Sequence, residues 1–395
     1  MSLPSSHEDL TRPDTTKLAS RIAILGPASI QIAFFLELTL VPVLLPSIQA
    51  DFGLSLGELA WVFNAYSIAM AVGILACAAG GDSFKSSKVF GFGVLFFLAG
   101  TALIYVATSN SVLTLGRVCQ GFGAGLFSPL IPVLLTQATP DRPGRTLILW
   151  GSTAGYVAAF APLVYGFFLD DENWSLAFLL IALVAAFSLF SLTTTPTRTR
   201  ASASDGRKSS YNALFGSQEL WLTLAYVFTT YGAITYFLFR VPLWLAEAGR
   251  DTASIGVVMS VLWLSFSTLS ALLRNWVDSN GLRPIMVAAP VLIALGLILA
   301  LTGNELLLIA SACLVGCGLA CSNAPSTQLV LRFAPKGLTA LATSLDITVA
   351  RLGGIVTVTF LADAGWGVSA CAILISCFFA VAFAFLIVNR SLEAV

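Results

Sequence analysis

The stretch LTLGRVCQGFGAG, Leu113 to Gly125, places an arginine and a glutamine in a part of the chain that is otherwise nearly free of charge. Burying a guanidinium in hydrocarbon costs roughly 2.5 to 3.5 kcal/mol on insertion scales, so Arg117 needs a compensating partner. The glycines are not a dinucleotide-binding loop, because no strand precedes them and the sixth position of that pattern is Leu126. We expect them to let helices approach closely.

The composition around this stretch is that of a polytopic membrane protein. The 395 residues are 57% hydrophobic and 10% charged, with 28 phenylalanines, which is far too apolar for a soluble protein of this size. The only histidine, His7, lies in a polar N-terminal segment that lacks the apolar core of a secretory signal. We expect this segment to be a cytosolic tail.

The apolar body lacks the groups that several classes of protein require. Without histidine it cannot build a histidine metal site or a Ser/His/Asp triad, and no GxxxxGK[ST] loop indicates ATP. We therefore expect no enzymatic activity, no cofactor, no nucleic-acid partner and a proton gradient as the energy source. The seven cysteines are expected to pack helices as thiols; soft-metal transport is the alternative for the stripe Cys313, Cys317 and Cys321.

Apolar windows of about 20 residues predict an all-α fold of twelve transmembrane helices. They lie near residues 22–46, 58–79, 89–107, 112–136, 146–168, 174–193, 220–245, 253–273, 284–303, 305–329, 338–362 and 366–388. A Ser/Arg-rich interruption, Thr195 to Ser210, divides them six and six. The predicted organisation is a tail, a six-helix bundle, a cytosolic linker, a second bundle and a short tail, at 1–20, 21–194, 195–218, 219–389 and 390–395.

Charges sort to opposite ends of these predicted helices. If the N-terminus is cytosolic, the loops on that side hold most lysines and arginines, whereas the other loops are acidic with Arg250 as their only base. Short cytosolic loops retain Lys and Arg. The sorting therefore predicts a cytoplasmic (inner) membrane protein with both termini in the cytosol.

The two halves repeat each other at an offset of 195 to 196 residues. GFGAGLFSP, which ends at Pro129, is matched by GCGLACSNAP, which ends at Pro325, and Asp82 corresponds to Asp278. This is a parallel repeat, in which the bundles are related by a pseudo-two-fold axis and the substrate site lies between them near the bilayer midplane.

These features together resemble the major facilitator superfamily, over essentially the whole chain from about Arg21. The family's fourth-helix pattern LxxxRxxQGxGA is fitted by Leu113, Arg117, Gln120, Gly121, Gly123 and Ala124. In proton-coupled members that arginine is implicated in proton transfer. Leu36 to Ala69 looks like the drug:proton antiporter pattern lDxTivnvaLPxIxxdfg…WvxxaY, with Glu37 where that branch usually has aspartate.

Other patterns of that branch are eroded. The fifth-helix pattern GxxxGPxxGG survives only as Ala161, Pro162 and Gly166, and the first GxxxDRxGR loop has Ser83 in place of its arginine. The resemblance implies that two short cytosolic turns latch the halves in the outward-open state, with plain topology signals as the alternative. The residues concerned are Asp82, Lys85, Lys88, Asp278, Gly281 and Arg283.

Glu37 is the predicted partner of Arg117. Glu37 lies about nine residues from the outer end of the first predicted helix and Arg117 about five from the outer end of the fourth, so their depths differ by about 6 Å. We expect Glu37, desolvated but stabilised by Arg117, to bind a proton on one side of the membrane and to lose it on the other. The alternative is a permanent ion pair that only fixes helix packing.

Further polar groups lie inside the predicted spans. Asp346 and Arg351 are five residues apart, about 140° around a helix, and should not pair with each other. Asp346 is a candidate second protonation or substrate-charge site, with snorkelling toward the cytosolic interface as the alternative. Candidates for the cavity wall, with packing or an interfacial belt as the alternative, are Gln31, Asn64, Tyr66, Gln120, Tyr156, Tyr231, Tyr236, Trp263, Asn323 and Arg351.

The sequence thus predicts a proton-coupled secondary transporter that works by alternating access. An aromatic content of 11% favours efflux of lipophilic or cationic small molecules. A carrier of a specific metabolite or siderophore-type solute, for export or uptake, is the alternative, and a non-transporting sensor is a further one. The expected partners are the solute, protons and the lipid bilayer, and the expected state is a monomer.

Overall fold

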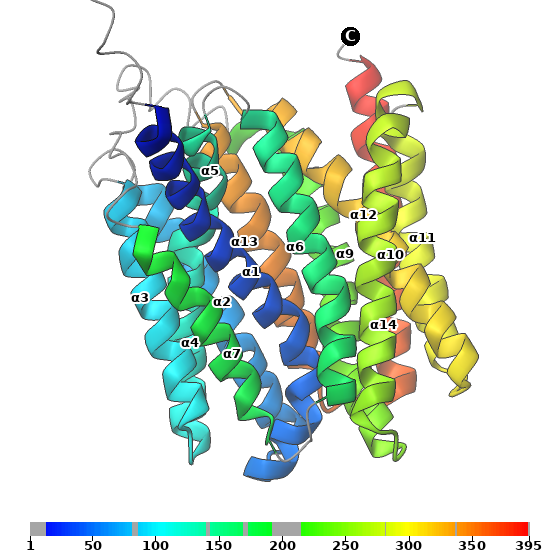
Figure 1. Ribbon diagram of the computed structural model, residues 1–395. Helices are drawn as coiled ribbons and strands as arrows, with labels where there is room; N and C mark the ends of the chain where they lie inside the picture. The colour runs from blue at the N-terminus through cyan, green and yellow to red at the C-terminus, as the bar shows by residue number, and fades with distance from the viewer. Residues whose placement is uncertain are drawn as a thin grey trace, which may run out of the picture.

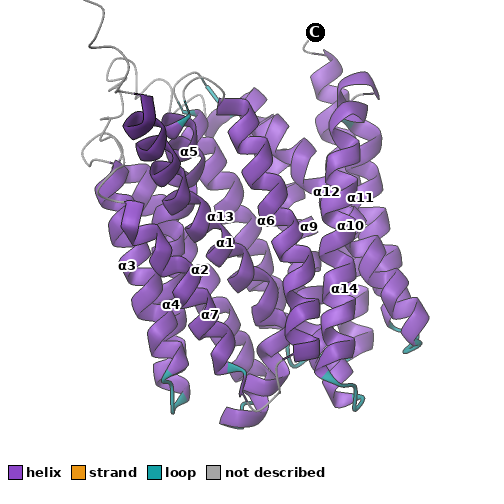
Figure 2. Ribbon diagram, viewed as in Figure 1, coloured by secondary structure: helices purple, strands orange, loops and turns teal. Residues whose placement is uncertain are grey.

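The computed structural model describes residues 13–80, 86–139, 143–168, 173–191, 215–280, 282–335 and 338–393. Within these residues the chain is helical, with short turns and no strand (Figures 1 and 2). The first half contains α1 (Pro13–Phe52), α2 (Leu56–Gly80), α3 (Ser86–Tyr105), α4 (Asn110–Phe127), η1 (Ser128–Leu130), α5 (Ile131–Ala138), α6 (Pro143–Phe168), α7 (Ser175–Ala186) and η3 (Phe187–Ser191). The second half contains α9 (Gln218–Glu247), α10 (Thr252–Asn280), α11 (Arg283–Ala300), α12 (Glu305–Phe333), α13 (Thr339–Leu361) and α14 (Trp366–Glu393).

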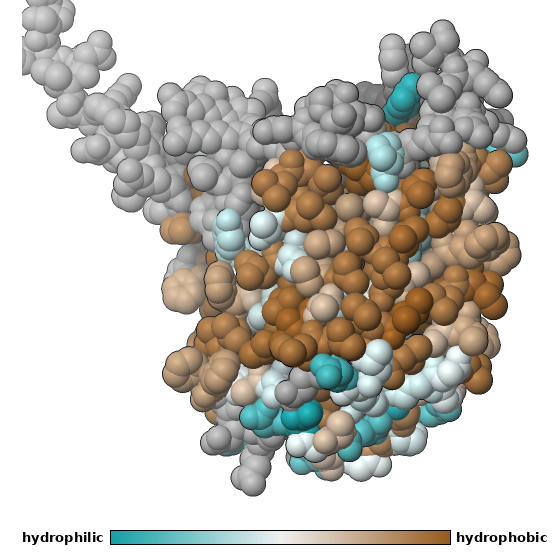
Figure 3. All heavy atoms as spheres, turned by 90° about the vertical axis from the view of Figure 1, so that its right-hand side faces the viewer, coloured by the Kyte–Doolittle hydropathy of each residue, from teal (hydrophilic) through white to brown (hydrophobic). Residues whose placement is uncertain are grey.

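These elements form the twelve predicted spans, because α4, η1 and α5 make one span and α7 with η3 makes another. Among the described residues, nine helices are long and apolar enough to cross a membrane. Three shorter apolar helices complete the set, at Gly155–Phe168, Ser175–Leu189 and Pro284–Ala300. Figure 3 shows a broad hydrophobic band on one side of the molecule, with hydrophilic side chains gathered below it. The twelve-helix fold predicted from the windows is confirmed.

The fourth span is not one continuous α-helix, as the single window at 112–136 suggests. It changes to a 3-10 turn at η1, where Pro129 occupies a first-turn position, and Pro132 opens α5 in the same way. A proline offers no backbone N–H and clashes with the preceding turn, and at Pro129 and Pro132 the α-helical ladder is interrupted.

Helix ends also differ from the windows. The helix α1 begins at Pro13, inside the predicted tail, and runs to Phe52 through Pro42 and Pro46. The windows score apolarity, whereas a helix can continue past the hydrocarbon into polar sequence. Most of the predicted linker 195–218 lies outside the described residues, and α9 begins at Gln218, where the Ser217 hydroxyl accepts a hydrogen bond from the Leu220 N–H.

The short turns between paired helices meet at one end of the molecule, the lower end in Figure 1. We call it the acidic end, because its described and exposed charged residues are mostly carboxylates: Asp51, Glu58, Glu247, Asp251 and Asp363, with Arg250 as a base. The opposite end, where Lys88 and Arg332 are exposed, is the basic end.

Glycines set the distances between helices in both halves. A Cβ on Gly121 would collide with the backbone of Tyr66 on α2, and one on Gly123 with the backbone of Phe97 on α3. The equivalent positions 195 residues later behave alike, since Gly316 meets the α10 backbone and Gly318 meets Ile293 of α11. The repeat seen in the sequence is therefore a repeat of helix packing, and the predicted packing role of the glycines is confirmed.

Contacts between the two bundles run along α2 with α13, α1 with α9, and α6 with α10. Asn64 on α2 donates to the Ile355 carbonyl (3.3 Å) and to the Thr359 hydroxyl (3.0 Å) near the acidic end of α13. Nearer the middle, the Ser267 hydroxyl donates to the Gly155 carbonyl at 3.2 Å. The cross-bundle hydrogen bonds of the described residues therefore lie between the middle of the molecule and its acidic end.

Candidate functional site

Glu37 and Arg117 form an ion pair inside the first bundle. The Arg117 Nη1 atom donates to Glu37 Oε1 at 2.6 Å, and both side chains are almost fully buried. Glu37 comes from the middle of α1, and Arg117 lies two turns into α4. The contact predicted from their similar depths is confirmed.

Arg117 is held from two further directions. Its Nη1 atom also donates to Gln120 Oε1 at 2.8 Å, and its guanidinium lies 4.5 Å from the ring centroid of Tyr66. Gln120 in turn donates to the Thr101 hydroxyl at 3.0 Å, which donates to the Phe97 carbonyl at 2.7 Å. The buried charge is thus stabilised by a carboxylate, an amide and an aromatic face, as a guanidinium in a low-dielectric interior requires.

A cavity of about 50 Å3 adjoins this pair and is lined by residues of both bundles. Glu37, Tyr66 and Arg117 come from the first bundle, and Thr235 and Arg351 from the second. Glu37 Oε2 and the Tyr66 hydroxyl are buried and have no hydrogen-bond partner among the described residues. A carboxylate oxygen left free at a cavity can accept a proton while its neighbour keeps the hydrogen bond from Arg117, although the carboxyl group is then neutral.

A second polar cluster lies within the other bundle. Asp346 on α13 is buried; its Oδ2 atom accepts from the Thr327 hydroxyl at 3.4 Å, and Oδ1 has no partner among the described residues. The Tyr231 hydroxyl on α9 donates to Asn323 Oδ1 on α12 at 2.8 Å, and Asn323 is exposed. The cluster offers a carboxylate and neutral polar groups, a combination suited to a protonated amine.

The match to known proteins identifies the family. The sequence model described as Major Facilitator Superfamily matches residues 28–358. The chain belongs to the major facilitator superfamily. It is therefore a multi-pass membrane transporter of small molecules rather than an enzyme, as the sequence predicts.

Curated relatives in this superfamily resemble only part of the chain. Drug efflux pump JefA of Mycobacterium tuberculosis (strain ATCC 25618 / H37Rv) is 33% identical over 147 residues, 37% of this chain and 29% of that protein. Multidrug resistance protein 3 of Bacillus subtilis (strain 168) is 28% identical over 178 residues, 45% of this chain and 35% of that protein. The chain thus matches about a third of the length of these relatives.

Solved structures of the superfamily share the whole architecture. A D-xylose-proton symporter superposes with a TM-score of 0.76 at 14% identity, covering 94% of this chain and 97% of that one. The nucleoside transporter NupG gives a TM-score of 0.73 at 16% identity, covering 93% and 99%. At this identity the likeness shows the transporter fold alone.

The remaining predicted cavity residues of this transporter are dispersed. Gln31 lines a separate cavity of about 220 Å3 between α1 and α5, and Tyr156 on α6 is exposed. Tyr236 and Trp263 are buried beside Trp366 and Phe266 respectively. Of the ten predicted wall residues, only Tyr66 and Arg351 share the cavity at Glu37; Gln120 lies behind Arg117 and Asn64 bridges the bundles.

Those predicted gating residues that the structure describes lie at the basic end. Asp82, Lys85 and Gly281 lie outside the described residues. Asp278 and Arg283 lie in the last turns of α10 and at the start of α11, and Lys88 is exposed in the first turn of α3. Their gating role stays a prediction.

The sequence places Arg240 near the outer end of the seventh predicted helix and favours snorkelling to water there, but the structure buries its side chain. Arg240 donates to both carboxylate oxygens of Glu247, at 2.9 and 3.1 Å, and lies 5.3 Å from the ring of Trp366. A spacing of seven residues returns to the same helix face, so this pair could have been found from the sequence. It ties the acidic end of α9 to the start of α14.

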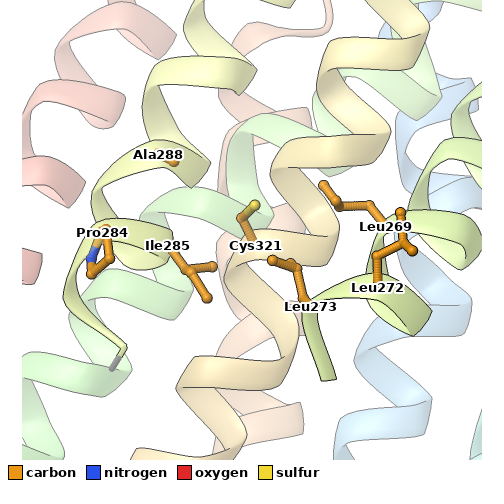
Figure 4. Close-up of a pocket in the computed structure, with 7 residues that line it drawn as sticks. All are labelled: Leu269, Leu272, Leu273, Pro284, Ile285, Ala288 and Cys321. Atoms are coloured by element: carbon orange, nitrogen blue, oxygen red, sulfur yellow. The ribbon is translucent and has the colours of Figure 1, made fainter. Parts of the chain in front are cut away.

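The thiol stripe on α12 lies away from the ion pair. Cys321 lines an apolar cavity of about 340 Å3 between α10, α11 and α12, together with Leu269, Leu272, Leu273, Pro284, Ile285 and Ala288 (Figure 4). Among the described residues no cluster of three or more histidine, cysteine, aspartate or glutamate side chains could hold a metal ion. The lining is hydrophobic, as expected where helices pack in a bilayer.

Proposed function

We propose that this transporter couples proton movement through Glu37 to the export of lipophilic or cationic small molecules. The observation that carries the proposal is the buried carboxylate with one paired and one free oxygen beside a cavity that both bundles line. An ionisable group at this depth is costly and is functional by default. The relatives named as drug efflux and multidrug resistance proteins support efflux as the direction.

The cycle follows from competition at Glu37. A proton on Oε2 neutralises the carboxylate, whereas a cationic solute near the cavity requires it charged, so the two ligands exclude each other. Asp346, with Tyr231 and Asn323, offers a second site for the positive group of the solute or for a second proton. Alternating access then moves the proton and the solute in opposite directions.

The orientation belongs to this proposal. We place the acidic end outside and both termini in the cytosol of a cytoplasmic (inner) membrane, because the short basic loops face the other side. In that orientation the cross-bundle hydrogen bonds close the outer end, and the described state faces the cytosol. The two bundles, 21–194 and 219–389, are the bodies that rock.

Reconstitution with Glu37→Gln tests the coupling. Purified protein in liposomes with an acidic lumen should accumulate ethidium, a fluorescent lipophilic cation, and Glu37→Gln should abolish accumulation while leaving the unfolding temperature unchanged. Glu58→Gln is the matched control, because Glu58 is exposed at the acidic end and caps α2 through Ser55. Full ethidium accumulation by Glu37→Gln would show that the Glu37 carboxylate does not couple proton movement to transport.

The same preparation separates the alternative function. A carrier of one metabolite or siderophore-type solute would move none of a panel of lipophilic cations but would move one of a panel of sugars, amino acids and hydroxamate chelators. Opposed pH gradients then give the direction, because an exchanger and a cotransporter accumulate solute under opposite gradients.

A further inference from the structure

We propose that Arg351 on α13 is a tethered counter-cation for Glu37. In the empty, deprotonated carrier Arg351 is attracted to the free oxygen of Glu37 across the bundle interface and holds the acidic end closed. A proton or a cationic solute at Glu37 displaces it and permits switching. This inference rests on the proposed role of Glu37 as the proton carrier.

The face of α13 that carries Arg351 is the face that meets the first bundle. Arg351, Ile355 and Thr359 are spaced by four residues and lie along one side of the helix. Asn64 of α2 hydrogen-bonds to the Ile355 carbonyl and to the Thr359 hydroxyl. This contact fixes the height of α13 against α2 and brings Arg351 to the cavity at Glu37.

Arg351 has no counter-charge of its own. It is half-buried and forms no hydrogen bond or ion pair with the described residues. Asp346, five residues earlier, lies about 140° around the helix and contacts Thr327 of α12 instead. An unpaired guanidinium at this depth requires an anion, and the free oxygen of Glu37 lines the same cavity.

The charges around the cavity give the switch its direction. The groups that face it are Glu37 from α1, Tyr66 from α2, Arg117 from α4 and Arg351 from α13, while α9 contributes only Thr235 and Leu238. When Glu37 is ionised, its carboxylate attracts two guanidiniums, that of Arg117 in the first bundle and that of Arg351 in the second. With Glu37 protonated, two like charges face each other across the interface and favour separation.

The cavity has room for this exchange. Its volume of about 50 Å3 is well above the roughly 10 to 15 Å3 that holding one water requires, so a water can bridge Arg351 and Glu37. An empty carrier that cannot switch is also what exchange requires, because a carrier that returns empty lets the solute leak down its own gradient.

The test uses a reporter that needs no solute. Spin labels at Glu58→Cys and Asp363→Cys, exposed residues in different bundles at the acidic end, report its closure in purified protein with the seven native cysteines replaced. We expect short distances to dominate at high pH and the longer-distance population to rise about tenfold on acidification. Arg351→Gln should show no pH-dependent change, and Arg351→Lys should restore it.

Arg332→Gln is the matched control, because Arg332 is exposed in the last turn of α12, and it should leave the change intact. A full pH-dependent change in Arg351→Gln, or none in the unmutated carrier, would overturn the inference. In liposomes Arg351→Gln should lose about tenfold in proton-driven ethidium accumulation.

The two proposals fail differently. If Glu37→Gln abolishes accumulation and Arg351→Gln keeps it, the proton carrier stands and the counter-cation role is wrong. If the distance between the spin labels changes with pH only when Arg351 is present, but no proton-driven transport occurs, the counter-cation role of Arg351 stands and the proposed function is wrong.

Discussion

At the scale of single residues, Arg117 depends on Gln120 as well as on Glu37. Replacing Gln120 with leucine removes an acceptor from a buried guanidinium and leaves the Thr101 hydroxyl without its donor. We expect Gln120→Leu to lower the free energy of unfolding by about 1 to 3 kcal/mol. The measurement is the unfolding midpoint in detergent, read by tryptophan fluorescence.

Thr101→Val is the graded comparison. This substitution keeps the shape of the side chain and the Arg117–Gln120 contact but removes the acceptor of the Gln120 amide. The free energy of unfolding should therefore fall by less than in Gln120→Leu, by about 1 kcal/mol. If Thr101→Val destabilised the protein more than Gln120→Leu, the hydrogen-bonded chain would not be what supports Arg117.

The sequence predicted part of this site for a physical reason. Glu37 and Arg117 are the isolated charges of two apolar helices, and their depths could be compared by counting residues. The support from Thr101 and the approach of Arg351 could not be predicted, because no spacing rule links residues on different helices. Tyr236 and Trp263 were chosen only for their amphipathic side chains, which suit a cavity wall and a packed interior equally well.

At the scale of elements, α4 and α2 are as close as two backbones allow. We expect Gly121→Ala to destabilise the protein by about 1 to 3 kcal/mol, because the added Cβ meets the backbone of Tyr66, which cannot give way like a side chain. Tyr66 covers Arg117, so proton-driven accumulation should also fall. Unfolding midpoint and ethidium accumulation are the two measurements.

Gly367→Ala is the matched control at this scale. Gly367 lies in the first turn of α14 and a Cβ there would meet nothing within 4 Å. The substitution should leave both measurements unchanged. Equal losses for the two alanine variants would attribute the effect to the glycine backbone in general rather than to the close contact.

Helices and their number could be predicted because each span carries its own signal, about 20 predominantly apolar residues. Their ends could not, since α1 continues through polar sequence and two prolines to Phe52. The break between α4 and α5 was equally hidden within an apolar window, although Pro129 and Pro132 mark it. The apolarity of a segment indicates which residues lie in the hydrocarbon of the membrane. Where a helix ends is decided instead by its backbone hydrogen bonds.

At the scale of the whole molecule, the balance between states depends on contacts between the bundles. Thr359→Val removes the acceptor that Asn64 reaches across the interface, so the acidic end should open more often. We expect a shift of severalfold toward the long-distance population of the Glu58 and Asp363 labels, as a cross-bundle hydrogen bond contributes about 1 kcal/mol.

Thr357→Val serves as the control two residues away on the same helix. The Thr357 hydroxyl donates to the Gly353 carbonyl within α13 and makes no cross-bundle bond in the described residues. Its label distances should match those of the unmutated protein. A shift as large as that of Thr359→Val would mean that α13 itself, and not the interface, had been disturbed.

The proline break in the fourth span separates two segments, α4 and α5, that are packed against different neighbouring helices. The α4 segment is packed tightly on α2 and α3, while α5 beyond the break packs on α1 and α6. Bending of this span therefore concentrates at residues 128–132, where the α-helical ladder is interrupted. The segment α5, at the basic end, can therefore move with its neighbours while the guanidinium of Arg117 on α4 keeps its position. One transmembrane span thus combines a part that moves during the transport cycle with a part that holds a charge in place.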